Sequence, residues 1–314
     1  MNIKTISRLV AGATATVAML TLAVTAYAAP PPPLTGNNVL YYSNKDGDNE
    51  IYMVNPAGSV QQLTANTNLQ DEAPAWRPQG DSFVFRSYVA NTTRAQLYSM
   101  SLPSQTVTQL TNDTNLVYDN PMYSPDGTQI VFSTTDPSSQ TCIGTLTVAT
   151  NVKTNLVCAD LNLRQSVSLP VWSPDGTKIM YTLNDGAFNR YAYSFATQTS
   201  TLLIPGAFTG VWSPDMTKIA FSRLPQLASG TEQSFTANAN DTNEQQVTSD
   251  APNGKTSNRV VAWYPSGDKL LMLTLASPDN LPAVRSLKLS DLSQQEVPHM
   301  NHTSDFAGAG AVKP

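Results

Sequence analysis

The sequence predicts an all-β protein: a six-bladed β-propeller with four-stranded blades, closed by the C-terminal strand pairing into the first blade. Two observations predict this fold class. A short turn motif occurs five times at a nearly constant interval, and each copy leads into a short apolar run. A repeat of roughly 40–50 residues built from strand-type units is typical of propellers.

The clearest copy of the motif is the stretch Val-Trp-Ser-Pro-Asp-Gly-Thr-Lys-Ile at residues 171–179. Ser173 takes the first position of a tight turn, and Pro174 takes the second, where its fixed φ is already suitable. Gly176 takes the fourth position, where the backbone often needs a positive φ. The apolar run 179–181 that follows is predicted to be a buried strand.

The copies are marked by an aromatic residue before each turn. These residues stand 47, 49, 40 and 51 positions apart, and they are Trp76, Tyr123, Trp172, Trp212 and Trp263. All four tryptophans of the chain belong to this set. We therefore interpret the aromatic residues as structural wedges between blades rather than as binding residues.

These motifs resemble the repeat of TolB-like propellers, a WD40-like β-propeller repeat of the form aromatic-Ser-Pro-Asp-Gly followed by an apolar strand. Residues 43–52, followed by Leu63 and Thr64, match the other half of that pattern. The resemblance covers roughly residues 38–312. TolB proteins also carry an α/β domain before the propeller, and we expect none here. One turn departs from the pattern, because Met216 stands where glycine is expected. A left-handed Met216 would cost about 1 kcal/mol, which suggests a remodelled turn.

The N-terminus has the features of an exported protein. Lys4 and Arg8 precede an uncharged, mostly apolar stretch, and Ala26-Tyr27-Ala28 fits a cleavage site. We predict a signal peptide at 1–28, a Pro-rich linker at 29–37 and the propeller domain at 38–314. The alternative is an N-terminal membrane anchor. The expected location is the periplasm or the secreted fraction.

Charge excludes some partners. Removal of residues 1–28 would leave 286 residues, with 16 basic and 23 acidic side chains and a net charge of −7. A mildly acidic surface with few charges argues against nucleic acid or an anionic membrane as partner. We expect a monomer with no integral membrane segment after signal cleavage.

The blades follow from the apolar runs between the motifs. Blade one contains the runs 39–43, 50–54 and 60–64, and the other five span 73–111, 121–158, 169–204, 209–248 and 260–297. Blade one lacks its own aromatic-Pro-Gly strand, and a ring does not leave such an edge unpaired. Residues 304–312 are predicted to fill that place. Seven blades would be the alternative, but too few residues remain for a seventh.

The two cysteines, Cys142 and Cys158, lie on either side of a polar turn around residue 150. In a hairpin centred there, they would face each other across two strands. Export into an oxidising compartment favours a disulfide. A pair of buried free thiols is the alternative.

Metal sites have weak sequence support. His299, His302 and Asp305 are spaced three apart, but a polar connection before the last strand explains them without a metal. Residues 46–50 contain Asp46, Asp48 and Glu50, but the later ligands of a calcium loop are absent, so a hairpin turn is predicted. We expect no metal and no cofactor.

Acidic residues mark one predicted mouth of the central channel. Asp71 and Asp119 precede the inner-strand prolines, which places them near one end of the channel. They are candidate channel-rim binding residues together with His302 and Asp305. The alternative role is capping of backbone N–H groups in the loops.

The TolB resemblance implies an exported, non-catalytic scaffold that binds a protein or peptide partner. The sequence has no Gly-x-Ser-x-Gly nucleophile motif and no catalytic residues are assigned. The alternative is a small hydrolase or lyase acting on a sugar or lactone at the channel, which would need converging titratable groups. A third alternative is a secreted domain of different function that shares only the repeat.

Overall fold

The computed structural model divides the chain into two units, Met1–Pro30 and Pro31–Pro314. All described residues belong to the second unit: 37–45, 47–92, 94–224, 231–249, 256–276, 281–301 and 306–312. The predicted signal peptide lies outside the described residues, as does the linker up to residue 36. Within the described ranges, no helix combines the length and the apolar character that crossing a membrane requires.

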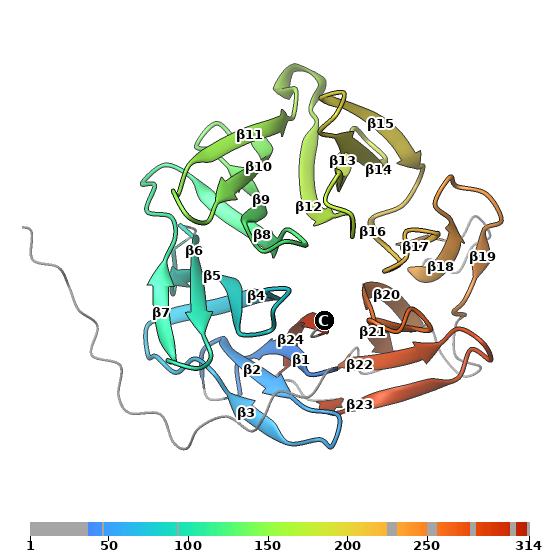
Figure 1. Ribbon diagram of the computed structural model, residues 1–314, viewed down its shortest axis with the longest axis horizontal. Helices are drawn as coiled ribbons and strands as arrows, with labels where there is room; N and C mark the ends of the chain where they lie inside the picture. The colour runs from blue at the N-terminus through green and yellow to red at the C-terminus, as the bar shows by residue number, and fades with distance from the viewer. Residues whose placement is uncertain are drawn as a thin grey trace, which may run out of the picture. The chain divides into compact units, whose positions relative to one another are not determined.

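The second unit contains six four-stranded antiparallel sheets arranged in a ring (Figure 1). From the inner to the outer strand, blade one consists of β24 (Phe306–Val312), β1 (Val39–Ser43), β2 (Glu50–Val54) and β3 (Val60–Gln62). Blade two consists of β4 (Leu69–Trp76), β5 (Ser82–Val89), β6 (Gln96–Ser101) and β7 (Thr106–Gln109). Blade three consists of β8 (Val117–Tyr123), β9 (Gln129–Thr135), β10 (Thr141–Thr147) and β11 (Lys153–Cys158).

The short 3₁₀ helix η1 (Leu161–Leu163) leads from blade three into blade four. Blade four consists of β12 (Ser166–Trp172), β13 (Lys178–Asn184), β14 (Phe188–Ser194) and β15 (Thr199–Ile204). Blade five consists of β16 (Thr209–Trp212), β17 (Lys218–Arg223), β18 (Gln233–Asn238) and β19 (Gln245–Gln246). Blade six consists of β20 (Thr256–Trp263), β21 (Lys269–Ala276), β22 (Leu281–Lys288) and β23 (Gln294–Asn301). The predicted all-β ring of six four-stranded blades is confirmed.

The C-terminal strand closes the ring, as predicted. β24 pairs antiparallel with β1, from Val39 opposite Val312 to Ser43 opposite Phe306, with two irregularities in register. The first and last strands of the described chain therefore share one sheet. Figure 1 shows the blue β1 and the red β24 side by side.

The repeated turns form for the reasons that the motif predicts. In blade four, Ser173 Oγ accepts a hydrogen bond from Lys178 N at 2.9 Å and donates to Asp175 Oδ1 at 2.6 Å. Gly176 has a φ of 71°, and its N–H donates to the Ser173 carbonyl. The turns at Ser124 and Ser213 make the same hydrogen bonds, so these three turns satisfy the hydroxyl of their serine while they reverse the chain.

The turn at Met216 is not remodelled, so that expectation was wrong. Met216 adopts a φ of 62°, and its N–H donates to the Ser213 carbonyl at 2.9 Å. The partly buried Met216 side chain packs against the apolar cluster that contains Trp212. This contact offsets part of the cost of a left-handed backbone at a residue other than glycine.

The aromatic residue of each motif is buried between two neighbouring blades. Trp76, for example, is 5% exposed and lies in a cluster with Leu40 and Ile51 of blade one and Phe83 of its own blade. The corresponding aromatic residues of the other blades, Tyr123, Trp172, Trp212 and Trp263, lie in equivalent clusters. The core therefore consists of apolar layers between blades.

In three blades, a polar side chain at the start of the third strand accepts a hydrogen bond from the segment that leads to the next blade. Glu50 in β2 accepts hydrogen bonds from Thr64 Oγ1 and Asn66 N, both at 2.5 Å. Gln96 in β6 accepts from Asp113 N at 3.1 Å. Gln233 in β18 plays the same part, since it accepts a hydrogen bond from the hydroxyl of Thr248 at 2.8 Å.

In blade three, a disulfide stands at this position. Cys142 is the second residue of β10 and is directly opposite Cys158 of β11, to which it is bonded. The predicted disulfide is therefore present. It joins the third strand to the fourth covalently, where blades one, two and five use hydrogen bonds.

Loss of this disulfide is expected to destabilise the protein by up to about 3 kcal/mol, because the bond closes a loop with a sequence separation of 16 residues. The test is urea unfolding of the parent with and without reductant, beside the Cys142→Ser/Cys158→Ser variant. Reductant should lower the midpoint of the parent to that of the variant and leave the variant unchanged. An equal midpoint for oxidised parent and variant would contradict the prediction.

Candidate functional site

The inner strands surround a cavity of about 560 Å³ on the axis of the ring. Five motif turns contribute one proline each to its wall: Pro78, Pro125, Pro174, Pro214 and Pro265. The inner strands β4, β8, β12 and β20 add mostly small or aliphatic side chains, among them Ala75, Met122, Val171 and Val261. The channel is therefore a mainly apolar, concave surface.

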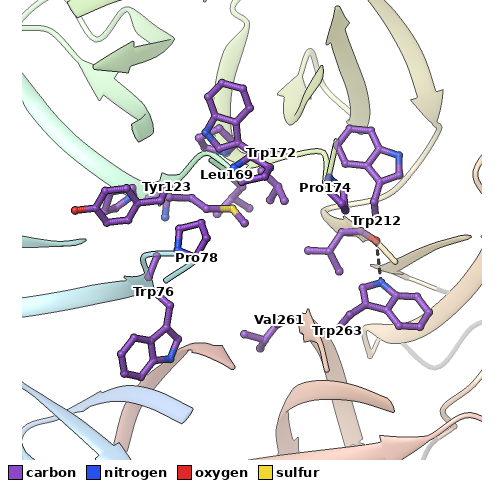
Figure 2. Close-up of a pocket in the computed structure, with 18 of the residues that line it drawn as sticks. Trp76, Pro78, Tyr123, Leu169, Trp172, Pro174, Trp212, Val261 and Trp263 are labelled. Atoms are coloured by element: carbon purple, nitrogen blue, oxygen red, sulfur yellow. Dashed lines mark hydrogen bonds between the residues drawn. The ribbon is translucent and has the colours of Figure 1, made fainter. Parts of the chain in front are cut away.

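The aromatic rings do not fill this channel. In Figure 2 the rings of Trp76, Trp172, Trp212 and Trp263 point away from the centre, whereas Pro78, Pro174 and Val261 lie toward it. Trp263 Nε1 donates to the Val211 carbonyl at 3.2 Å, which holds its ring against the neighbouring blade. The aromatic residues still contribute to the channel wall.

Three of the inner strands contain a backbone irregularity at the channel wall. Ala73, Asn120 and Leu169 have φ values of 51°, 49° and 50°, and each directly precedes a proline of the wall. Each strand loses register with its neighbour at this point. A positive φ costs a residue other than glycine about 1 kcal/mol, so the surrounding structure must impose this shape.

One end of the channel carries a cluster of charged side chains, which we call the Asp119 mouth: Asp119, Glu72, Arg86, Tyr88 and Asn49. Arg86 Nη1 contacts Asp119 Oδ2 at 2.9 Å, and Arg86 Nε donates to Glu72 Oε2 at 2.9 Å. Glu72 Oε1 accepts from Tyr88 Oη at 2.9 Å and from Asn49 Nδ2 at 2.6 Å. The cluster joins blades one, two and three beside the wall residues Ala73 and Asn120.

The electrostatics of the mouth are set by partial burial. Burial raises the pKa of Asp119, and the Arg86 guanidinium opposes this effect. Burial, reinforced by the Glu72 carboxylate, raises the pKa of Tyr42 to about 12, so that its hydroxyl stays protonated. With both carboxylates ionised, Asp119, Glu72 and Arg86 together carry one net negative charge.

Of the predicted rim residues, the structure places Asp119 at the mouth and buries Asp71. Asp71 is only 3% exposed and accepts a hydrogen bond from Asn66 Nδ2 at 3.1 Å. Burial raises the pKa of Asp71 and also that of neighbouring Glu50. Asp71 is therefore not exposed on the rim, which differs from the expected placement. His302 and Asp305 lie outside the described residues.

Metal ligands do not converge in the part of the chain that the structure describes. There, no group of three or more His, Cys, Asp or Glu side chains could hold a metal ion. Position 299 lies in β23, and Asp46 is outside the described residues. The expected absence of a metal stays a prediction.

The side of the ring opposite the charged cluster is aromatic. Phe188, at the start of β14, is 44% exposed and packs edge-on against Phe208, with ring centroids 4.9 Å apart. The Arg259 guanidinium lies 4.7 Å from the centroid of Phe208. It donates to Glu232 Oε2 from Nη2 at 2.8 Å and from Nε at 3.0 Å, and to Oε1 from Nε at 3.2 Å. Glu232 neutralises the charge of Arg259, so Phe188 and Phe208 remain an apolar surface.

Sequence reasoning missed Arg190, which is fully buried in β14. Its guanidinium donates to the carbonyl groups of Leu169 and Gly210, both at 3.0 Å, and to Thr182 Oγ1 at 2.7 Å. Burial lowers its pKa to about 9. Arg190 thus ties inner strand β12 to inner strand β16. Arg190 stands at the position that Ile51 and Leu97 occupy in blades one and two. An arginine at a position that is apolar in those blades is the sequence feature that could have indicated it.

The fold is similar to several solved structures. TolB from Acinetobacter baumannii shares 16% identity with a TM-score of 0.68, and the match covers 87% of this chain but 65% of that one. A putative TolB from Agrobacterium tumefaciens shares 19% identity with a TM-score of 0.63, covering 88% and 92%. An oligogalacturonate lyase in complex with manganese shares 14% identity with a TM-score of 0.62, covering 86% and 75%. Identities this low show the fold alone.

No match was found among curated protein sequences. The profile of the family described as TolB beta propeller domain matches residues 5–190, more than half of the 314-residue chain. That match contains three of the five motif copies, and the described blades have the architecture that the repeat predicts. The chain belongs to the TolB beta-propeller family.

Proposed function

We propose that this protein is an exported, non-catalytic scaffold that binds a protein or peptide partner at the Asp119 mouth and in the channel behind it. The observation that carries the proposal is an apolar cavity of about 560 Å³ that lies beside a charged cluster. Cavities of this size with mostly apolar walls and a few polar groups at the edge are typical of binding sites.

The walls favour binding over catalysis. Among the described residues that line the channel, none is an acid, a base, a cysteine, a serine or a histidine, and Asn120 and Tyr123 are the polar ones apart from the tryptophans. A lyase or hydrolase needs titratable groups within hydrogen-bond reach of its substrate, and beside this cavity such groups converge at the Asp119 mouth, where Asp119 and Glu72 are paired with Arg86. The likeness to an oligogalacturonate lyase keeps the enzymatic alternative open to test.

The proposed location is the periplasm or the secreted fraction. The signal-like order of residues 1–28 supports it, and so does the disulfide, since such bonds persist in oxidising compartments. A monomer remains our expectation.

The test is capture of partners from the exported fraction with the mature protein and two variants. Val261→Lys places a charge on the channel wall and should abolish capture of the specific partner. Val152→Lys changes a 59% exposed valine outside the channel and should capture like the parent. Both variants should keep the unfolding midpoint of the parent within experimental error.

A partner captured equally by all three proteins would place binding elsewhere on the ring. Incubation of the mature protein with oligogalacturonate and Mn²⁺ tests the enzymatic alternative. Formation of unsaturated products that depends on the channel residues would contradict a non-catalytic role.

A further inference from the structure

We propose that the segment entering the channel is an extended, mainly apolar peptide with one lysine or arginine side chain, which binds Asp119 at the mouth. This inference rests on the proposed function and specifies the chemistry of the partner. It follows from the acceptor positions of Asp119 that remain open, from the net charge of the mouth and from the apolar wall of the channel.

Asp119 can accept a hydrogen bond from a ligand, whereas Glu72 is already occupied. Glu72 is 7% exposed, and its two oxygens already accept hydrogen bonds from Arg86, Tyr88 and Asn49. The Asp119 side chain is 38% exposed and accepts from Arg86 and from Asn120 N. A carboxylate offers about four acceptor positions, so Asp119 has room for a further donor.

The charges of the mouth determine the sign of the charge that a ligand can bring to it. Arg86 contacts both carboxylates of the mouth, and its side chain is 23% exposed. An anionic ligand would meet Arg86 only beside two negative groups, whereas a cationic ligand neutralises the excess negative charge. A cation is therefore the group that the mouth favours.

The channel wall determines the character of the rest of the ligand. Behind the mouth the channel wall consists mainly of prolines and aliphatic side chains. The inner strands β4 and β8, which run along the channel, have 8 and 7 residues. A strand rises about 3.3 Å per residue, so the channel is about as long as an extended peptide with the same number of residues. Such a peptide can place apolar residues in the channel while its cationic side chain stays at the mouth.

The test is selection from a displayed library of random linear peptides on the mature protein. Peptides that bind the parent but not Val261→Lys should be enriched in one lysine or arginine flanked by apolar residues. For a synthetic selected peptide, Asp119→Asn should weaken binding about tenfold, since one charge-assisted hydrogen bond is worth about 1.5 kcal/mol or more. Added salt should weaken binding to the parent more than to this variant.

Asp119→Asn preserves the side-chain shape and an acceptor for Arg86, so it should fold as the parent does. The matched control is Asp185→Asn, which removes one negative charge from the exposed turn between β13 and β14 and should bind like the parent. Channel-dependent peptides without cationic enrichment, or equal binding to Asp119→Asn, would overturn this inference and leave the proposed function standing. Failure to select any channel-dependent peptide would overturn both.

Discussion

A chain that ends at Asn301 is expected to lose most of its stability and to aggregate. This truncation removes β24, which pairs with β1 along its whole length and completes blade one. It would expose the backbone edge beside Val39, Leu40 and Tyr41, which are at most 4% exposed in the closed ring. Loss of one strand and solvation of this core should cost on the order of 5 kcal/mol, comparable with the whole stability of many domains.

Thermal unfolding and size-exclusion chromatography of the truncated chain measure this effect. A chain ending at Val312 is the matched control, because it keeps β24 and loses only the last two residues. The control should unfold like the parent, while the shorter chain should melt far lower or elute as aggregate. A truncated chain as stable and monomeric as the parent would show that β24 is dispensable for closure.

Stability is expected to fall as the pH rises from about 4.5 to 8, and Glu50→Gln should remove most of this dependence. Burial raises the pKa of Glu50 from its ordinary value of 4.5 to about 8. Between these values the folded protein binds a proton that the unfolded chain has released. Stability therefore decreases with rising pH in this window, by roughly 2–4 kcal/mol.

The same position in blades two and five carries Gln96 and Gln233, so the fold already accommodates an amide at this point. Urea unfolding at pH 5 and pH 8 should give a large difference for the parent and a small one for Glu50→Gln. Glu244→Gln, which removes a partly exposed carboxylate paired with Arg223, is the control and should keep the pH dependence of the parent. Equal pH dependence of parent and Glu50→Gln would contradict the assignment.

Much of the fold could be predicted because its determinants are local and repeated. The turn at Ser173, Pro174 and Gly176 carries its own hydrogen bonds and backbone preferences, so each copy marks a strand pair without knowledge of distant residues. Five copies mark the inner strands of five blades, the apolar runs mark a sixth, and the missing inner strand of blade one pointed to the C-terminal residues. The disulfide followed from the symmetry of one hairpin.

The sites depend on contacts between blades, which no local pattern reports. Asp71 and Asp119 both precede an inner-strand proline, yet Asp71 is buried beside Glu50 while Asp119 meets Arg86 at the mouth. The difference arises because the residue that corresponds to Asp119 is Glu72, which stands directly before the left-handed residue of its strand. Asp71 lies one position earlier, and successive residues of a strand point to opposite faces. Glu72 and Asp119 therefore meet at Arg86, and this contact between blades two and three is visible only in the folded ring.

The sequence by itself determined the repeat, the ring closure and the disulfide, since these follow from turn chemistry, strand periodicity and cysteine spacing. Only the tertiary structure decided the left-handed Ala73, Asn120 and Leu169 and the burial of Arg190. A left-handed residue before proline is disfavoured locally, and a buried arginine is costly alone. Both persist because packing of adjacent inner strands around one axis supplies carbonyl acceptors and compensating contacts that exist only in the closed ring.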